Sequence, residues 1–241
     1  GRGLETASRK GRLRTVISNA AAMPQAMKER LVAQLGPGLL HDTYGSTEAG
    51  IVSNLRPADQ LRKQQCVGQP FPCTLIEIRR ADGNICAPDE VGELYSRSPY
   101  LFNGYWGRPE ETAETYRDGW VTVGDLARQD AEGHLYIVDR LKDMVISGGV
   151  NIYPREVEEV IFRHPEVADV ALIGVPDERW GEVLKAFVVR RAGSSLDEAA
   201  LVAALEGQIS RMKLPKYVEF IAQIPRNASG KVLKTALRAR G

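Results

Sequence analysis

Tight-turn dipeptides divide the middle of the chain into short segments. They are Asp82-Gly83, Asp118-Gly119 and Glu132-Gly133, and apolar residues alternate with polar ones around them. Asp-Gly between alternating segments is typical of a β-hairpin, because glycine readily adopts the positive φ angle that the tightest turns need. The pattern predicts an antiparallel, barrel-like β subdomain over residues 66–140.

The residues before this region have the pattern of an α/β unit. Residues 13–17 are expected to form a short buried strand, and a helix is expected to begin at Pro24 and to end at Gly36. The apolar face expected for this helix comprises Met27, Leu31 and Leu35. The polar sequence HDTYGSTEAG at 41–50 is interpreted as a loop that follows the unit.

The residues after Arg140 combine helices and strands again. The expected elements are helices at 154–162 and 195–205 and strands at 167–175 and 183–191. Ser195 is expected to cap the second helix, with Glu198 completing a capping box. The turn at 139–143 is the expected domain boundary, which divides the chain into residues 1–141 and 142–241.

Composition excludes several classes of protein. With 43% hydrophobic and 26% charged residues, the chain has the composition of an ordinary globular protein. Its net charge of +1 gives no overall positive electrostatic potential that would attract nucleic acid. The three cysteines form no CxxC pair and the three histidines have no metal-ligand spacing with them, so reduced thiols and no zinc site are expected. The apolar runs are too short to span a membrane, and a cytoplasmic location is expected.

Two common phosphate-binding motifs are absent from the sequence. No G-x-G-x-x-G occurs, and Gly230-Lys231 does not fit the P-loop pattern. Pro225 stands in the place of the first glycine of that pattern and Val232 follows the lysine. Neither a dinucleotide-binding fold nor a P-loop NTPase is supported.

Four separated polar segments nevertheless carry groups suited to a phosphate ligand. In 44–50, Tyr44 offers a face to a base and Glu48 a hard oxygen to Mg²⁺, although a plain surface loop explains the segment equally well. Asp125 and Arg140 could hold a ribose or form a structural salt bridge.

The other two segments lie nearer the end of the chain. The pair Gly148-Gly149 is expected to form a hairpin turn. Lys231, in PRNASGKVLK, is either a solvated lysine or a mobile cation for a phosphate whose negative charge grows during reaction.

In order along the chain, these segments resemble the adenylate-forming superfamily of acyl-CoA synthetases, luciferases and peptide-synthetase adenylation domains. The matching segments are SNAAAMP (18–24), DTYGSTEAG (42–50), GELYSRSPYLFNGYW (92–106), GWVTVGDLARQDAEGHLYIVDRLKDMVISGGVNIYPREVE (119–158) and PRNASGKVLK (225–234). The resemblance implies an α/β plus α+β fold. Residues 1–141 would be the end of a large AMP-binding domain, and residues 142–241 a small mobile domain.

The resemblance also implies roles for individual residues. The ATP/AMP-binding residues would be Asn19, Ala20, Ala21, Asp42, Thr43, Tyr44, Gly45, Ser46, Thr47, Asp125, Arg140 and Lys231. Tyr44 would stack on the adenine, and Glu48 would hold Mg²⁺. The catalytic residues would be Lys231, Glu48 and Thr47.

In the small domain, the resemblance implies that Lys142 is the hinge about which this domain rotates between two half-reactions, adenylation and thioesterification. The residues near CoA would be Ser147, Gly148, Gly149 and Trp180. For Trp180, a core or surface position is nearly as good an interpretation. Lys231 would stabilise the transition state of adenylation and would then leave the site.

The implied enzyme is an AMP-forming acyl-CoA ligase that uses ATP, Mg²⁺, CoA and a carboxylic acid, as in fatty acid metabolism. The family's Ser/Thr/Gly-rich loop, which holds the β- and γ-phosphates, is not found in this sequence. The chain is therefore expected to correspond to the second half of such an enzyme and to be inactive without the N-terminal half.

Several alternatives stay open. One is the adenylation domain of a peptide-synthetase-like enzyme, and another is a non-catalytic nucleotide-binding fragment. The identity of the acid is not indicated, and a homodimer is left open.

Overall fold

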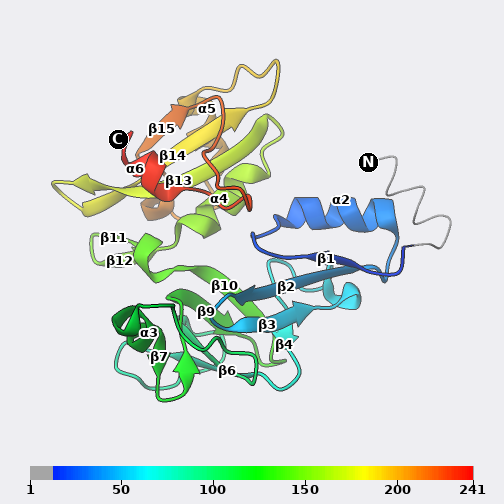
Figure 1. Ribbon diagram of the computed structural model, residues 1–241. Helices are drawn as coiled ribbons and strands as arrows, with labels where there is room; N and C mark the ends of the chain where they lie inside the picture. Colours follow the sequence, from blue (N-terminus) through cyan, green and yellow to red (C-terminus); the bar gives the residue numbers. More distant parts are fainter. Residues whose placement is uncertain (1–12, 241) are drawn as a thin grey trace. The chain divides into compact units, whose positions relative to one another are not determined.

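The computed structural model describes residues 13–240 (Figure 1). The chain divides into two compact units, Gly1–Val138 and Asp139–Gly241. The division falls at the start of the turn predicted as the domain boundary, three residues before Lys142. The role of Lys142 as a hinge stays a prediction.

The first sheet of unit 1 contains the predicted α/β unit. Its strands, in spatial order, are β1 (Val16–Ser18), β2 (Leu40–Ser46), β3 (Gly50–Leu55) and β4 (Gln69–Pro70). β1 is parallel to β2, and helix α2 (Gln25–Leu35) connects them, ending at Gly36 as predicted. The remaining pairs of the sheet are antiparallel.

Two predictions for this part of the chain are wrong. The first strand is not buried, because it lies at the edge of the sheet and Ile17 is 65% exposed. Residues 41–50 are not a loop but most of a hairpin, in which β2 and β3 flank a turn at 47–49. The polar side chains suggested a loop, whereas pairing of β2 with strands on both sides satisfies its backbone groups.

The buried face of α2 includes Leu35, as expected, but its other buried residues are polar. Met27 is 43% exposed, whereas Gln25 and Lys28 are 3% and 2% exposed. The Lys28 ammonium lies 2.6 Å from a carboxylate oxygen of Asp42 and donates a hydrogen bond of 3.1 Å to the carbonyl of Cys66. A buried charge is tolerated only when it is paired, so the helix docks through a polar network.

The second sheet of unit 1 is antiparallel, as predicted. Its path is β10 (Leu135–Arg140), β9 (Asp125–Gln129), β6 (Gly92–Arg97), β8 (Trp120–Val121) and β7 (Tyr116–Arg117), with β5 (Leu75–Arg79) paired to β6. Each predicted dipeptide lies between two strands of this sheet. Asp118 and Gly119, at φ 54° and 79°, form the two-residue turn between β7 and β8.

The two sheets of unit 1 share a core, and short helices complete the unit. The buried core residues are Ala49, Val52, Ile78, Leu94, Val121, Ala127 and Leu135. The helices are η1 (Pro57–Asp59) and α3 (Pro109–Thr115). The first sheet is thereby packed on the sheet that carries Asp125.

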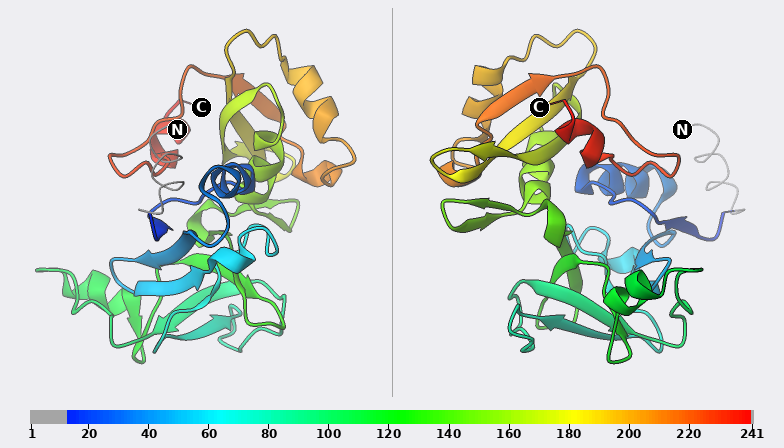
Figure 2. Two further views of the ribbon diagram at one scale, coloured as in Figure 1. Left: turned by 90° about the vertical axis from the view of Figure 1, so that its right-hand side faces the viewer. Right: turned by 60° about the vertical axis from the view of Figure 1, so that its left-hand side comes forward.

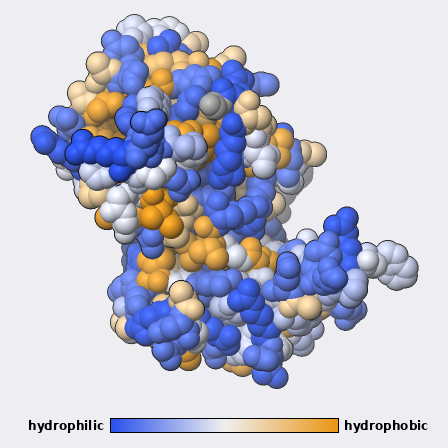
Figure 3. All heavy atoms as spheres, turned by 90° about the vertical axis from the view of Figure 1, so that its left-hand side faces the viewer, coloured by the Kyte–Doolittle hydropathy of each residue, from blue (hydrophilic) through white to orange (hydrophobic). Residues whose placement is uncertain are grey.

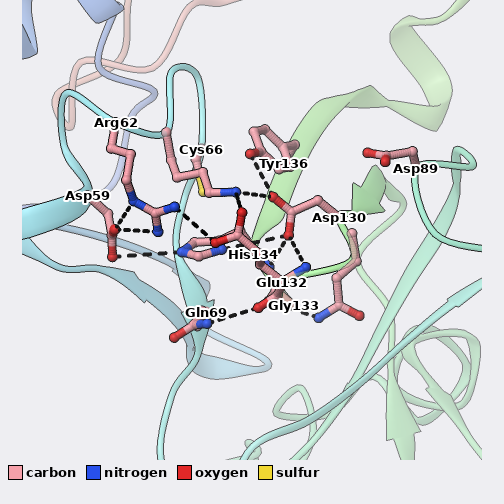
Figure 4. A network of polar contacts seen from close by, with 12 residues as sticks. Asp59, Arg62, Cys66, Gln69, Asp89, Asp130, Glu132, Gly133, His134 and Tyr136 are labelled. Atoms are coloured by element: carbon pink, nitrogen blue, oxygen red, sulfur yellow. Dashed lines mark hydrogen bonds and ion pairs between the residues drawn. The ribbon is translucent and has the colours of Figure 1, made fainter.

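A polar network anchors the turn between β9 and β10 to the segment after η1 (Figure 4). Lys63 bridges Asp130 at 2.8 Å and Glu132 at 2.7 Å, and Arg62 also pairs with Glu132. Asp130 accepts further hydrogen bonds from the backbone N–H of His134 and from the Tyr136 hydroxyl. This network fixes the far end of the hairpin whose β9 strand begins at Asp125.

Unit 2 is a five-stranded sheet covered on both faces by helices. Its strands are β11 (Val145–Ser147), β12 (Val150–Ile152), β13 (Val167–Asp177), β14 (Gly181–Arg190) and β15 (Tyr217–Phe220). Its helices are η2 (Leu141–Asp143), α4 (Pro154–Phe162), α5 (Glu198–Leu205), η3 (Arg211–Lys213) and α6 (Lys234–Arg238).

Alternation along β13 assigns the helices of unit 2 to faces. Leu172 packs with residues of α4 and α5, whereas its neighbours Ala171 and Ile173 pack with Leu237 of α6. Successive side chains of a strand point to opposite faces, so α6 lies on the face opposite α4 and α5 (Figure 2). The segment that carries Lys231 leads into α6 and therefore lies on the face of the sheet formed by Ala171 and Ile173.

One helix cap in unit 2 was predicted wrongly. The α5 N-cap is Asp197, whose carboxylate accepts a hydrogen bond of 2.8 Å from the backbone N–H of Ala200, rather than Ser195. Both residue types are good caps, and the helix begins at Glu198, so the nearer one is used.

Candidate functional site

The predicted nucleotide residues of unit 1 gather around the C-terminal end of β2. In the parallel pairing of β1 and β2, Ser18 is opposite Asp42, and the Thr43 hydroxyl donates a hydrogen bond of 3.1 Å to the Ser18 carbonyl. The exposed strip Asn19–Ala21 therefore continues directly from a residue bonded to the DTYGST segment. Ala20 has φ 74°, a conformation that non-glycine residues adopt mainly at turns and functional sites.

Tyr44 joins this strand end to the second sheet. Its hydroxyl donates a hydrogen bond of 2.5 Å to a carboxylate oxygen of Asp125, the first residue of β9. Asp125 is 7% exposed, so the contact lies in a region of low water content, where a hydrogen bond to a carboxylate is strong. The two residues are 81 positions apart, and the sequence gives no sign of their contact.

Glu48 lies in the turn between β2 and β3, next to exposed Thr47. The Tyr105 hydroxyl donates a hydrogen bond of 2.6 Å to a Glu48 carboxylate oxygen, and this bond, together with burial, raises the pKa of Tyr105. The Glu48 carbonyl accepts the backbone N–H of Phe102 at 2.9 Å. Sequence reasoning missed Tyr105, although it lies within the matching segment 92–106.

Asp42 has a different environment from the one expected of a nucleotide ligand. It is 6% exposed, and its carboxylate is paired with Lys28 inside the unit. The structure therefore gives its side chain a contact that holds α2 on β2. Lys28 was also missed, because a single lysine on a helix has no sequence pattern that distinguishes it.

Gly45 is required because the backbones of β2 and β3 approach each other closely at this position. A Cβ atom there would lie 2.0 Å from the Gly50 carbonyl oxygen, a separation that no side chain can tolerate. The glycine lets the two backbones approach at the register shift between Tyr44 and Gly45. The turn that presents Thr47 and Glu48 depends on this approach.

In unit 2, the segment around Lys142 is held by backbone and side-chain contacts. The Asp139 carboxylate accepts hydrogen bonds from the backbone N–H groups of Arg140 at 2.8 Å and Arg155 at 2.9 Å. Lys142 is exposed in the short helix η2, and the next residue, Asp143, lies 2.7 Å from the Arg238 guanidinium. Arg140 lies at the end of β10.

The predicted CoA residues form one cluster. Gly148 and Gly149, at φ 55° and 81°, make the expected two-residue turn between β11 and β12. A Cβ atom on Gly148 would lie 2.8 Å from the Trp180 ring, and the Gly148 N–H donates a hydrogen bond of 2.8 Å to the Trp180 carbonyl. Ser147 is buried beside this turn.

Trp180 is a surface residue rather than a core one. It is 41% exposed, and Ile146 and Met212 nearby are 49% and 47% exposed. On the face that Figure 3 presents, hydrophobic residues form small patches in a largely hydrophilic surface. The predicted contact of Trp180 with CoA remains a prediction.

Lys231 lies on an exposed loop that precedes α6. Its backbone N–H donates a hydrogen bond of 2.9 Å to the Asn227 side chain, and its carbonyl accepts the Asn227 N–H at 2.9 Å. These two hydrogen bonds connect the ends of the loop, at residues 227 and 231.

The structure thus brings the predicted nucleotide residues of unit 1 into one cluster. In unit 2, predicted site residues form two separate groups, at 147–149 and at 231. Within residues 13–240, no three His, Cys, Asp or Glu side chains form a group suited to a metal ion. Also within those residues, no helix has the length and apolar character that crossing a membrane requires.

Sequence comparison identifies the family. Residues 3–106 match the family described as AMP-binding enzyme, and residues 156–231 match the AMP-binding enzyme C-terminal domain. The chain belongs to the adenylate-forming, AMP-binding enzymes. The resemblance to the adenylate-forming superfamily is confirmed.

Individual relatives of this AMP-binding chain are similar to it over nearly its whole length. A feruloyl-CoA synthase from an Amycolatopsis species is 44% identical over 230 residues, which are 95% of this chain and 46% of that protein. The structure of the amide bond synthetase McbA from Marinactinospora thermotolerans superposes with a TM-score of 0.91 at 33% identity, over 99% of this chain and 51% of that one.

A third relative was solved with a reaction intermediate. The o-succinylbenzoate CoA synthetase MenE from Bacillus subtilis, in complex with its acyl-adenylate intermediate, has a TM-score of 0.87 at 31% identity, over 98% of this chain and 49% of that one. These neighbours confirm the predicted fold class. The chain spans about half the length of the relatives it matches.

Proposed function

We propose that this chain is part of an ATP-dependent acyl-CoA ligase, which converts a carboxylic acid to its acyl-adenylate and then to its CoA thioester. The observation that carries the proposal is the hydrogen bond of 2.5 Å between Tyr44 and Asp125. It joins the DTYGST segment to the carboxylate assigned to the ribose, within one compact unit. The feruloyl-CoA synthase and the CoA synthetase among the relatives support an acid and CoA as the substrates.

In the proposed first half-reaction, the substrate carboxylate attacks the α-phosphorus of ATP and pyrophosphate leaves. Negative charge grows on the phosphate oxygens, and the ammonium of Lys231 and the hydroxyl of Thr47 stabilise it. Asp125 and Arg140 hold the ribose hydroxyls, and Tyr44 contacts the adenine. The strip Asn19–Ala21 and the segment 42–46 complete the nucleotide site.

Glu48 is the residue proposed to hold Mg²⁺. Its carboxylate offers the hard oxygen ligand that Mg²⁺ prefers, and the Tyr105 hydroxyl at 2.6 Å orients that carboxylate. When bound, Mg²⁺ neutralises negative charge on the phosphates.

In the proposed second half-reaction, the CoA thiol attacks the acyl carbon of the adenylate and AMP leaves. Ser147, Gly148, Gly149 and Trp180 are the proposed CoA contacts, and Lys142 is the proposed hinge between the two half-reactions. Because a Ser/Thr/Gly-rich phosphate loop is not found in the 241 residues, we propose that this chain alone does not catalyse ATP–pyrophosphate exchange.

A second candidate function is amide formation. The similarity to an amide bond synthetase, with a TM-score of 0.91, supports it. In that reaction an amine, rather than the CoA thiol, would take the acyl group from the adenylate. A peptide-synthetase-like adenylation domain would transfer it to a carrier thiol instead.

The proposal is tested with the full-length protein, ATP, Mg²⁺ and a panel of aryl and fatty acids. We expect acid-dependent release of pyrophosphate, and formation of AMP and a CoA thioester once CoA is added. Amide formed from an added amine, with no thioester, would favour the second candidate. Nucleotide binding without turnover of any acid would favour a non-catalytic binding protein.

A further inference from the structure

The loop that carries Lys231 has little contact with the core of unit 2. Ala228, Ser229 and Lys231 are exposed, whereas Val232, directly after the lysine, packs with Leu237 in the core. Before Val232, the loop itself is held by polar contacts. The Asn227 side chain accepts the backbone N–H groups of Ser229 at 3.1 Å and Lys231 at 2.9 Å, which shapes the loop but does not attach it to the sheet.

Arg226 makes that attachment. One terminal nitrogen of its guanidinium donates to both carboxylate oxygens of Asp169, at 2.9 and 2.8 Å. The other donates a hydrogen bond of 2.9 Å to the carbonyl of Gly230, the residue directly before Lys231. Asp169 lies in β13, so a single planar group ties the peptide next to Lys231 to a strand of the sheet.

We propose that Arg226 is a positioning residue for Lys231, an inference that rests on the adenylation role proposed for that lysine. Arg226 acts through the Gly230–Lys231 peptide and touches no substrate. A lysine at position 226 would keep the charge, but its single ammonium cannot span Asp169 and Gly230 as the guanidinium fork does. The electrostatic effect of Lys231 depends on its placement, and a misplacement of about 1 Å can cost on the order of a hundredfold in rate.

The contacts beyond Lys231 explain why such a variant stays folded. Leu237 is fully buried, Lys234 lies 3.4 Å from Glu158, and Arg238 lies 2.7 Å from Asp143. These contacts hold α6 without Arg226. The Arg226–Asp169 pair is itself partly exposed, and exposed ion pairs add little to global stability.

The first arm of the test follows backbone hydrogen exchange in the 241-residue chain. Arg226→Lys should speed exchange in residues 227–231 and leave β13 and α6 unchanged. The matched control is Arg240→Lys, which alters an arginine of the same segment, 3.5 Å from Glu219, and should leave residues 227–231 unchanged. Unchanged exchange of 227–231 in Arg226→Lys would overturn the proposal.

The second arm measures the two half-reactions in the full-length protein. Arg226→Lys and Asp169→Asn should each slow adenylation about 10- to 100-fold, and the double variant should be no slower than either alone. Thioesterification of supplied acyl-adenylate should be unchanged. Equal loss in both half-reactions, or additive losses in the double variant, would overturn the positioning role.

The two arms also separate this inference from the proposed function. If Lys231→Ala retained full adenylation, the role proposed for Lys231 would fail, whatever the exchange result. If Lys231→Ala abolished adenylation while Arg226→Lys left it at the wild-type rate, the proposed function would stand and the positioning role of Arg226 would fail.

Discussion

Replacing Tyr44 by phenylalanine removes one hydroxyl from the centre of the proposed nucleotide site. That hydroxyl donates a hydrogen bond of 2.5 Å to Asp125, whose exposed fraction is 7%. Hydrogen bonds to charged groups contribute about 1.5–3 kcal/mol, and burial of the acceptor favours the upper part of that range. The ring remains in place, so the loss of packing should be small.

A double-mutant cycle isolates this contribution. The free energy of unfolding of unit 1 is measured for the wild type, Tyr44→Phe, Asp125→Ala and the double variant, by hydrogen exchange in β2 and β9 under increasing urea. We expect a coupling energy of about 1.5–3 kcal/mol between the two positions. In the full-length protein, Tyr44→Phe should also weaken ATP binding, because Asp125 would no longer be oriented toward the ribose.

The control is Tyr100→Phe, which alters a tyrosine that is 48% exposed. Paired with Asp125→Ala in the same cycle, it should show no coupling beyond about 0.5 kcal/mol, the usual scatter for independent sites. A Tyr44–Asp125 coupling as small as this would refute the reasoning.

Two further predictions concern the polar network and the cysteines of unit 1. Burial raises the pKa of Asp130, but hydrogen bonds from Lys63, the His134 N–H and Tyr136 outweigh it and hold that pKa below its ordinary value of 3.8. The folded state therefore gains stability from Asp130 above about pH 4, which it loses on further acidification, and Asp130→Asn should flatten the acid limb of a stability-against-pH curve. Burial raises the pKa of the Cys66 thiol to about 11, so iodoacetamide at pH 8 should alkylate exposed Cys73 and reach Cys66 only after unfolding, as peptide mass mapping would show.

The hairpin turns and the long buried strands of this fold were predicted correctly from the sequence. Asp118-Gly119 and Gly148-Gly149 form the hairpin turns expected of them, because a two-residue turn is determined by the φ angles of its own residues. The buried strands β13 and β14 were predicted from apolar runs rich in valine, a β-branched residue that favours strands.

Contacts between distant residues could not be predicted in this way. Tyr105 and Glu48 are 57 positions apart and Tyr44 and Asp125 are 81 apart, so their pairing depends on how the sheets pack and has no local pattern. Lys28 was missed for the same reason, since its partner Asp42 is on another element. The roles assigned to Tyr44, Glu48 and Asp125 stay predictions, and their hydrogen-bond partners were not predicted.

The proposed mechanism depends most on the role assigned to Lys231. The direct measurement is the rate of each half-reaction in Lys231→Ala of the full-length protein, with acyl-adenylate supplied for the second. Removing one preorganised group that stabilises transition-state charge typically costs about a hundred- to a thousandfold, so pyrophosphate release should fall by at least that much while thioester formation from supplied adenylate continues at the wild-type rate. Equal loss in both half-reactions, or unimpaired pyrophosphate release, would contradict it.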